Sequence, residues 1–246
     1  LVYWLARQRA GSRGPGLLAV ALLATLPVFD QNVTGAGMEL HNLAMIALVM
    51  AVGVLYLRAP DEDRLALLVV GAVLLAQSRY ESALFVIPVA VVIVLGWLRA
   101  GRVLLPWMAL MAPLLLVPYA WHHRVVSASP ILWQLHEGET TRFGWRYLAG
   151  NLAGARRFFF GTSPALSNSW WFTVFGLVAL GWAGVQGWRH FHRPRLARRE
   201  VSPESVVIAA FGAAIAANLA LLMFYYWSRL DEPIASRFAL PAYLLL

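Results

Sequence analysis

The stretch LHNLAMIALVMAVGVLYL, residues 40–57, carries no Asp, Glu, Lys or Arg and is about as long as a bilayer's hydrocarbon core is thick. Residues 15–121 hold about five such apolar stretches, separated by brief polar segments. Across the chain, 60% of the residues are hydrophobic and only 13% are charged. A water-soluble domain of 246 residues could not bury this much apolar surface, so we expect lipid to be its main solvent.

Continuous apolar runs predict membrane-spanning helices, because backbone amides in hydrocarbon must find hydrogen-bond partners within their own segment. The predicted spans are 15–29, 40–57, 65–78, 82–98, 103–121, 169–188 and 205–227. Residues 1–6 resemble the end of an earlier span and residues 238–246 the start of a later one, so we expect a fragment of a longer protein. The predicted fold is a single all-α domain over 1–246, a polytopic transmembrane helix bundle of about seven full spans with partial spans at both ends.

The basic residues distinguish the two sides of this predicted bundle. The net charge is +8, and all 20 basic residues are Arg. Many of them lie in short loops at alternate ends of the spans, which therefore share one side: Arg7, Arg9 and Arg13; Arg58 and Arg64; Arg99 and Arg102; and Arg189, Arg193, Arg195, Arg198 and Arg199. Because Arg-rich loops are typical of the cytoplasmic side, we place the N-terminal loop and loop 189–204 there. We expect a multi-pass protein of a bacterial plasma membrane, with lipid and not nucleic acid as its partner.

The other side would receive residues 30–39, 79–81, 122–168 and 228–237. In the long outer loop 122–168, segment 142–160 mixes Arg with aromatic and apolar residues. Helical spacing would give this segment one apolar and one cationic face, which is typical of a helix lying in the membrane interface. It could serve as a spacer or as a lid over a lipid-linked substrate.

The same outer loop also contains residues that could bind a metal ion. They are His122, His123, His136, Glu137 and Glu139. Their spacing matches no familiar metal site, so we predict solvated side chains and no metal. The chain has no Cys, which excludes disulfides, thiolate metal sites and Cys nucleophiles.

Three polar segments at the outer ends of the spans hold the candidate functional residues. The first, DQNVTGAGMELH at 30–41, offers Asp30 and Glu39 as possible acid or base groups and His41 as a lining residue. Solvated loop carboxylates are the alternative interpretation.

The second and third polar segments supply arginines. In Arg79-Tyr80-Glu81 the guanidinium group could offer its planar donor fork to a phosphate, or it could extend to the lipid headgroups beside Glu81. The third segment, 228–241, contains Asp231 and also Arg237, which could bind phosphate or anchor a span at the interface. We name Arg79 and Arg237 as candidate phosphate ligands, with Tyr80, Glu81 and Asp231 as lining residues.

Three stretches resemble the GT-C glycosyltransferases, the family of membrane enzymes that includes protein O-mannosyltransferases and lipid A aminoarabinose transferases. Leu1 to Met45 is similar to the family's unit of arginine-rich turn, small-residue helix, Pro, outer loop and helix. Residues 76–84 (AQSRYESAL) resemble its short turn with a basic residue. Residues 236–243 (SRFALPAY) resemble its late Arg-Tyr-x-x-Pro motif, with Phe238 in place of Tyr.

The resemblance implies an enzyme that transfers a sugar from a polyprenyl-phosphate carrier to an acceptor on the outer face, without a further cofactor. Arg79 and Arg237 would contact the donor phosphate. The family's catalytic Asp lies in the first outer loop, which we expect upstream of this sequence, so the resemblance transfers no catalytic base to this chain. Asp30 and Glu39 stay catalytic candidates as the carboxylates of the first polar segment. Two other functions remain open, a transporter or flippase subunit and a polymerase or ligase for surface polysaccharide.

Overall fold

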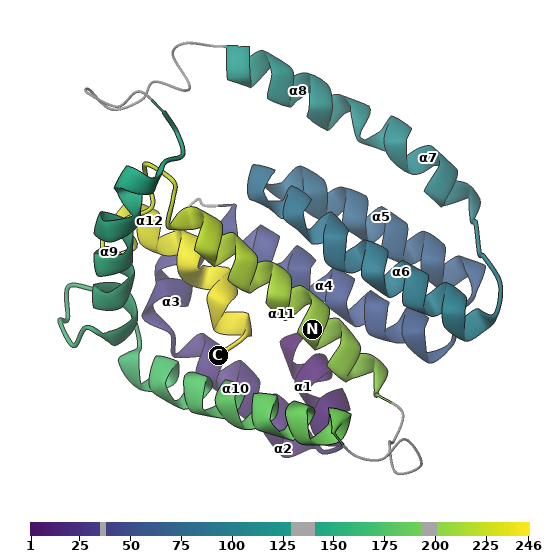
Figure 1. Cartoon of the computed structure of the whole chain (residues 1–246), viewed down its shortest axis with the longest axis horizontal. Helices are drawn as coiled ribbons and strands as arrows, with labels where there is room; N and C mark the ends of the chain where they lie inside the picture. Colours follow the sequence, from purple (N-terminus) through teal and green to yellow (C-terminus); the bar gives the residue numbers. More distant parts are fainter. Residues whose placement is uncertain (35–37, 129–140, 193–200) are drawn as a thin grey trace.

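The computed structural model describes residues 1–34, 38–128, 141–192 and 201–246, and these residues form a helical fold without a named strand (Figure 1). The all-α prediction is therefore confirmed for the described chain. The longer helices are α1 (Val2–Ala10), α2 (Arg13–Ala24), α3 (Pro27–Thr34), α4 (Glu39–Arg58), α5 (Glu62–Ser78), α6 (Val86–Ala100), α7 (Trp107–Leu115), α8 (Val117–Ala128), α9 (Leu148–Phe160), α10 (Trp170–Phe191) and α11 (Pro203–Leu222). Shorter helical turns are η1 (Tyr80–Phe85), η2 (Trp145–Tyr147), α12 (Pro233–Ser236) and η4 (Arg237–Leu244).

Three helical segments in the described chain are long and apolar enough to cross a membrane: Glu39–Arg58, Glu81–Ala100 and Pro203–Leu222. A fourth span results if α2 and α3, which meet at a 70° bend just before Pro27, are counted as one. The chain thus has the helical character of a membrane protein. The predicted number of seven spans is not confirmed.

Of the remaining predicted spans, 169–188 corresponds to the single 22-residue helix α10 (Trp170–Phe191), whereas those at 65–78 and 103–121 differ from a single long apolar helix for local reasons. The prediction at 65–78 corresponds to α5, whose 17 residues begin with the charged Glu62, Asp63 and Arg64. The prediction at 103–121 is divided between α7 and α8, and proline within α7 weakens helix continuity there. Since α8 continues to Ala128, the outer loop begins later than predicted.

The core of the bundle lies around α4. In α4, 72% of the 18-residue apolar window is buried within the bundle. The corresponding share is 28% for each of Glu81–Ala100 and Pro203–Leu222. Helices α5, α6 and α11 pack around it (Figure 1). Fully buried side chains such as Ile46, Tyr56 and Phe211 fill the space between the helices. Without a hydrophobic driving force in lipid, such close packing is what holds helices together.

The bundle has two ends of different chemistry. At one end the Arg58 Nε donates to Glu204 at 2.8 Å, and the Arg58 Nη2 donates to the Gln8 side chain at 2.7 Å. Arg99 at the same end donates to the carbonyl oxygens of Leu57 at 2.8 Å and Val201 at 3.1 Å. The Arg-rich segments that the sequence analysis places on the cytoplasmic side therefore do gather at one end of the bundle.

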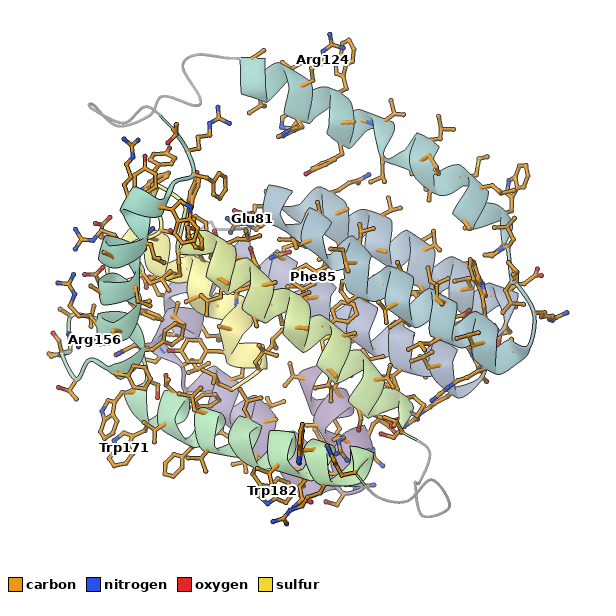
Figure 2. All side chains as sticks on the ribbon, viewed as in Figure 1. Glu81, Phe85, Arg124, Arg156, Trp171 and Trp182 are labelled. Atoms are coloured by element: carbon orange, nitrogen blue, oxygen red, sulfur yellow. The ribbon has the colours of Figure 1, made fainter. Side chains whose placement is uncertain are left out.

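The predicted interfacial segment 142–160 contains η2 and α9. Phe158 on α9 is buried against the bundle, whereas Arg156 is exposed and points away from it in Figure 2. Trp171 and Trp182 project outward from the neighbouring α10 and are 58% and 67% exposed (Figure 2). The α-helical part of the segment is thus α9 alone, with one face buried and Arg156 on the exposed face beside Leu152 and Phe160.

The contact between α4 and α6 yields a stability prediction. A Cβ at Gly96 would overlap the ring of Tyr56, which is fully buried, whereas a Cβ at Gly71 would lie an ordinary 3.4 Å from Val49. We expect Gly96→Ala to destabilise the protein by about 1–3 kcal/mol through overpacking. Gly71→Ala is the matched control. Thermal unfolding in detergent measures both, and a Gly96→Ala Tm equal to that of the control would contradict the packing.

The separation of the two ends yields a second prediction. Arg102 follows α6 at the end that holds Arg58, and Arg156 lies on α9 at the other end. Because the chain has no Cys, Arg102→Cys and Arg156→Cys each introduce a unique thiol. We expect an impermeant maleimide to label these thiols from opposite sides of sealed vesicles. Labelling from the same side would show that the bundle does not span the bilayer in this orientation.

Candidate functional site

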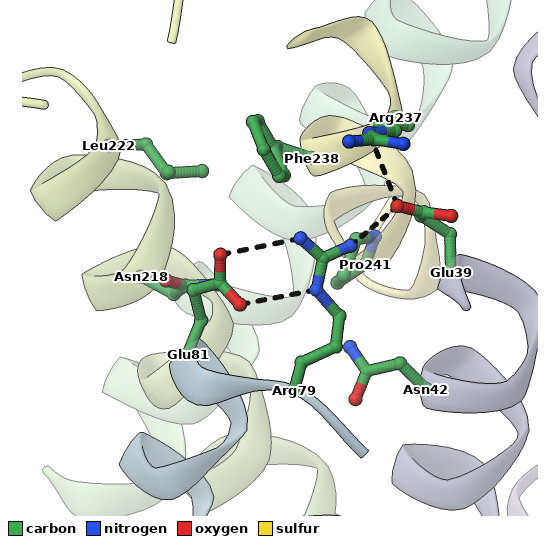
Figure 3. Close-up of a pocket in the computed structure, with 9 residues that line it drawn as sticks. All are labelled: Glu39, Asn42, Arg79, Glu81, Asn218, Leu222, Arg237, Phe238 and Pro241. Atoms are coloured by element: carbon green, nitrogen blue, oxygen red, sulfur yellow. Dashed lines mark hydrogen bonds and ion pairs between the residues drawn. The ribbon is translucent and has the colours of Figure 1, made fainter. Parts of the chain in front are cut away.

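A pocket opens at the end of the bundle where α4 begins and α5 ends (Figure 3). Its volume is about 330 Å³ when the open space at its mouth is included. Nine residues line it: Glu39, Asn42, Arg79, Glu81, Asn218, Leu222, Arg237, Phe238 and Pro241.

The charged lining residues come from three separate segments that end or begin at this point. Glu39 is the first residue of α4, where the positive end of the helix dipole favours a carboxylate. Arg79 lies between α5 and η1 in extended backbone, with φ −156° and ψ 156°, so the helix stops there and its side chain turns into the pocket. Arg237 begins η4. The folded chain thus joins residues that lie far apart in the sequence.

Glu39 and Arg79 form the centre of the site. The Arg79 Nη1 donates to Glu39 Oε1 at 2.7 Å. The Arg237 Nε lies 3.2 Å from the same oxygen, an ion-pair distance without the alignment of a hydrogen bond. On its other side, Arg79 donates to Glu81 through Nε at 3.1 Å and Nη2 at 3.3 Å (Figure 3). One carboxylate oxygen therefore holds two guanidinium groups.

Burial differs strongly among these four charges. The side chain of Glu39 is 5% exposed and that of Arg79 is 17% exposed, whereas those of Arg237 and Glu81 are 37% and 35% exposed. The buried Oε2 of Glu39 has no hydrogen-bond partner within the described residues. Burying charges costs free energy that only close opposite charges offset, which explains why the inner carboxylate has two arginine neighbours. The formal charges of the four groups cancel.

Phe238 places an aromatic ring between the two arginines. The Arg79 Cζ lies 5.0 Å from the ring centroid and the Arg237 Cζ lies 5.6 Å from it. At these distances each guanidinium group is attracted to the electron-rich ring face. The ring therefore helps to keep both arginines in place.

Beneath the charges, Asn42 organises a small hydrogen-bond network that the sequence analysis did not identify. Its buried Oδ1 accepts from the Ser78 Oγ at 2.8 Å and from the Ser82 Oγ at 2.6 Å. These bonds tie α4 to the residues on both sides of Arg79. The available signal was the helical spacing of Asn42 from Glu39, which places both on one face of α4.

The structure brings together four of the predicted site residues, namely Glu39, Arg79, Glu81 and Arg237. Asp30 and His41 are exposed and do not line the pocket. Tyr80 begins η1, and its side chain lies outside the described part of the chain. The predicted lining residues His41 and Asp231 thus lie elsewhere on the same end of the bundle.

Asp231 belongs to a second charged cluster. Its Oδ2 lies 3.0 Å from the Arg157 Nη2 and 3.3 Å from the Arg229 Nη2. A Cβ at Gly154 would clash with its Oδ1, so α9 approaches the loop after α11 closely because that position is glycine. This cluster links α9 to the chain that leads into η4.

The end of α11 is capped by α9. The buried Asn151 side chain donates to the carbonyl oxygens of Met223 at 3.0 Å and Tyr225 at 2.7 Å. Burial raises the pKa of Tyr225, and Tyr226 and Glu81 raise it further, so this phenol stays protonated at neutral pH.

The residues considered as metal ligands do not gather in the described structure. Among the residues searched, no group of three or more His, Cys, Asp or Glu side chains is close enough to hold a metal ion. His122 and His123 lie on α8, and His136, Glu137 and Glu139 lie outside the described residues.

The shared oxygen of Glu39 yields a prediction about coupling. Removing either Arg79 or Arg237 leaves Glu39 with one cation, whereas removing both leaves it buried and unpaired. We expect Arg79→Ala with Arg237→Ala to destabilise the protein more than the sum of the single changes, by about 0.5–3 kcal/mol. Thermal unfolding measures this. The control pair is Arg79→Ala with Arg64→Ala, whose effects should add because Arg64 pairs with Asp61 at the other end of α5.

Comparison with protein-family models, with curated proteins and with solved structures finds no match for this chain. The roles of the site residues therefore rest on their geometry.

Proposed function

We propose that this chain is the membrane part of a glycosyltransferase that moves a sugar from a polyprenyl-phosphate-linked donor to an acceptor on the outer face of a bacterial plasma membrane. Arg79 and Arg237 would bind the donor phosphate in the pocket at the end of the bundle. The chain's resemblance to GT-C enzymes suggested the reaction. The geometry of the pocket supports the choice of residues.

One observation carries the proposal. Two arginines that are 158 positions apart, at 79 and 237, meet on one carboxylate at the rim of an apolar helix bundle. A lipid-tethered phosphate presents its charge at such a rim while its isoprenoid tail stays in hydrocarbon. Planar guanidinium groups match the oxygens of a phosphate in pairs. The pocket therefore offers two guanidinium groups at the position that this donor headgroup requires.

The same residues suit the chemistry of transfer. Cleavage of the bond between the sugar and the phosphate leaves negative charge on the departing phosphate, and fixed cations beside it stabilise that charge. A carboxylate would take the proton of the acceptor. Glu39 contacts both arginines through Oε1, so we assign it a positioning role. Asp30 lies on α3, which packs against α4 and η4, and is the candidate base within this chain.

The position of the charges favours this function over transport. Transporters bind substrate near the bilayer midplane, often on broken helices. Here Glu39 is the first residue of a 20-residue candidate span, and Arg79 follows the last residue of α5. The charged groups thus lie at helix ends, where a headgroup can reach them.

Replacement of Arg79 tests the proposal. We expect Arg79→Ala in the full-length protein to lower sugar transfer from a polyprenyl donor about 30-fold or more, because a charge-assisted phosphate contact worth about 2 kcal/mol is lost. Arg64→Ala, an ion-paired arginine at the other end of α5, is the matched control. Full activity of the Arg79 variant would remove this residue from the site.

A further inference from the structure

Building on the proposed donor site, we propose that Glu81 is an internal competitor of the donor phosphate. In the structure its carboxylate accepts hydrogen bonds from the paired N–H donors of Arg79, and it leaves them when a phosphate binds. Glu81 would then set the affinity for the donor without contacting the sugar.

The contact geometry identifies the position that Glu81 occupies. The two oxygens of Glu81 accept from the Nε and Nη2 of Arg79 at 3.1 and 3.3 Å, side by side. Two oxygens of a phosphate use the same pair of donors. The third nitrogen, Nη1, is held by Glu39 at 2.7 Å. All three guanidinium nitrogens therefore contact carboxylates, and a phosphate can take the Nε–Nη2 fork of Arg79 only by displacing Glu81.

Exposure decides which carboxylate leaves. The side chain of Glu81 is 35% exposed, and the residue lies in the first turn of the short 3₁₀ helix η1, so it can rotate into solvent and regain hydration. Glu39 is 5% exposed, begins a helix at the centre of the bundle and also faces Arg237. A partly exposed ion pair contributes little to stability, whereas an unpaired buried charge is costly. Displacing Glu81 therefore costs less free energy than displacing Glu39.

The charges that remain after displacement define the ligand class. Arg79, Arg237 and Glu39 together carry a formal charge of +1, because two guanidinium groups face one carboxylate. A sugar linked to a lipid through a single phosphate is a phosphodiester with one negative charge. The charge of +1 and the charge of the phosphodiester cancel. In the structure the two arginines and two glutamates of the pocket cancel in the same way. The geometry therefore suits a phosphodiester headgroup.

The experiment uses a probe that does not depend on the identity of the sugar. A methyl polyprenyl phosphate, which is a phosphodiester with one negative charge, is titrated into the full-length protein in nanodiscs of phosphatidylcholine, a zwitterionic lipid without net charge. We expect Glu81→Gln to bind this probe roughly fivefold more tightly than the wild type, since an opposing ion pair is removed. Glu232→Gln is the matched control, because Glu232 pairs with Arg229 outside the pocket. Arg79→Ala should bind weakly.

The outcomes separate this inference from the proposed function. Equal binding by the wild type and Arg79→Ala would overturn the phosphate site itself. Weak binding by Arg79→Ala with unchanged or weaker binding by Glu81→Gln would leave the site and overturn the role of Glu81. Glu81→Ala is measured in parallel with thermal unfolding of every variant. If both Glu81 variants lose binding and stability together, Glu81 is a structural partner of Arg79 and the inference fails.

Discussion

The ion pairs that converge on Glu39 Oε1 determine how the polar end of this bundle is built. That oxygen joins the start of α4, the turn after α5 and the first residue of η4. A buried carboxylate with a single cation would be poorly compensated, so both arginines must stay close to it. Neighbouring features support the same contacts, with Phe238 between the guanidinium groups and Asn42 bonded to the serines that flank Arg79.

The apolar part of the molecule and the charged pocket impose complementary constraints. In hydrocarbon, helices associate through close packing, and the contact between Gly96 and Tyr56 is an example. Charges are costly at depth, so they collect at helix ends. One end of this bundle gathers Arg58, Arg99 and Glu204, and the other gathers the pocket. The bundle thereby places a cluster of paired charges at the ends of its apolar helices.

The sequence predicted the helical class and the grouping of arginines because these depend on composition and period, which are local properties. It also singled out Glu39, Arg79, Glu81 and Arg237, since charges beside apolar runs are conspicuous. It did not show that Arg79 and Arg237 share one oxygen, because contacts between distant segments depend on packing. It placed Asp231 with them by proximity to Arg237, whereas the structure pairs Asp231 with Arg157. The divided helix at 103–121 reflects backbone breaks that hydropathy alone does not register.

The anchoring of α9 by Asn151 has a consequence for how a ligand reaches the site. That amide satisfies backbone oxygens of Leu222, Met223 and Tyr225 at the end of α11, and Asp231 ties the same helix to the chain before η4. Lifting α9 away would strand these oxygens in apolar surroundings at considerable cost. The amphipathic helix, which contributes no residue to the pocket lining, is therefore held fixed, and any opening that admits a ligand must come from another segment.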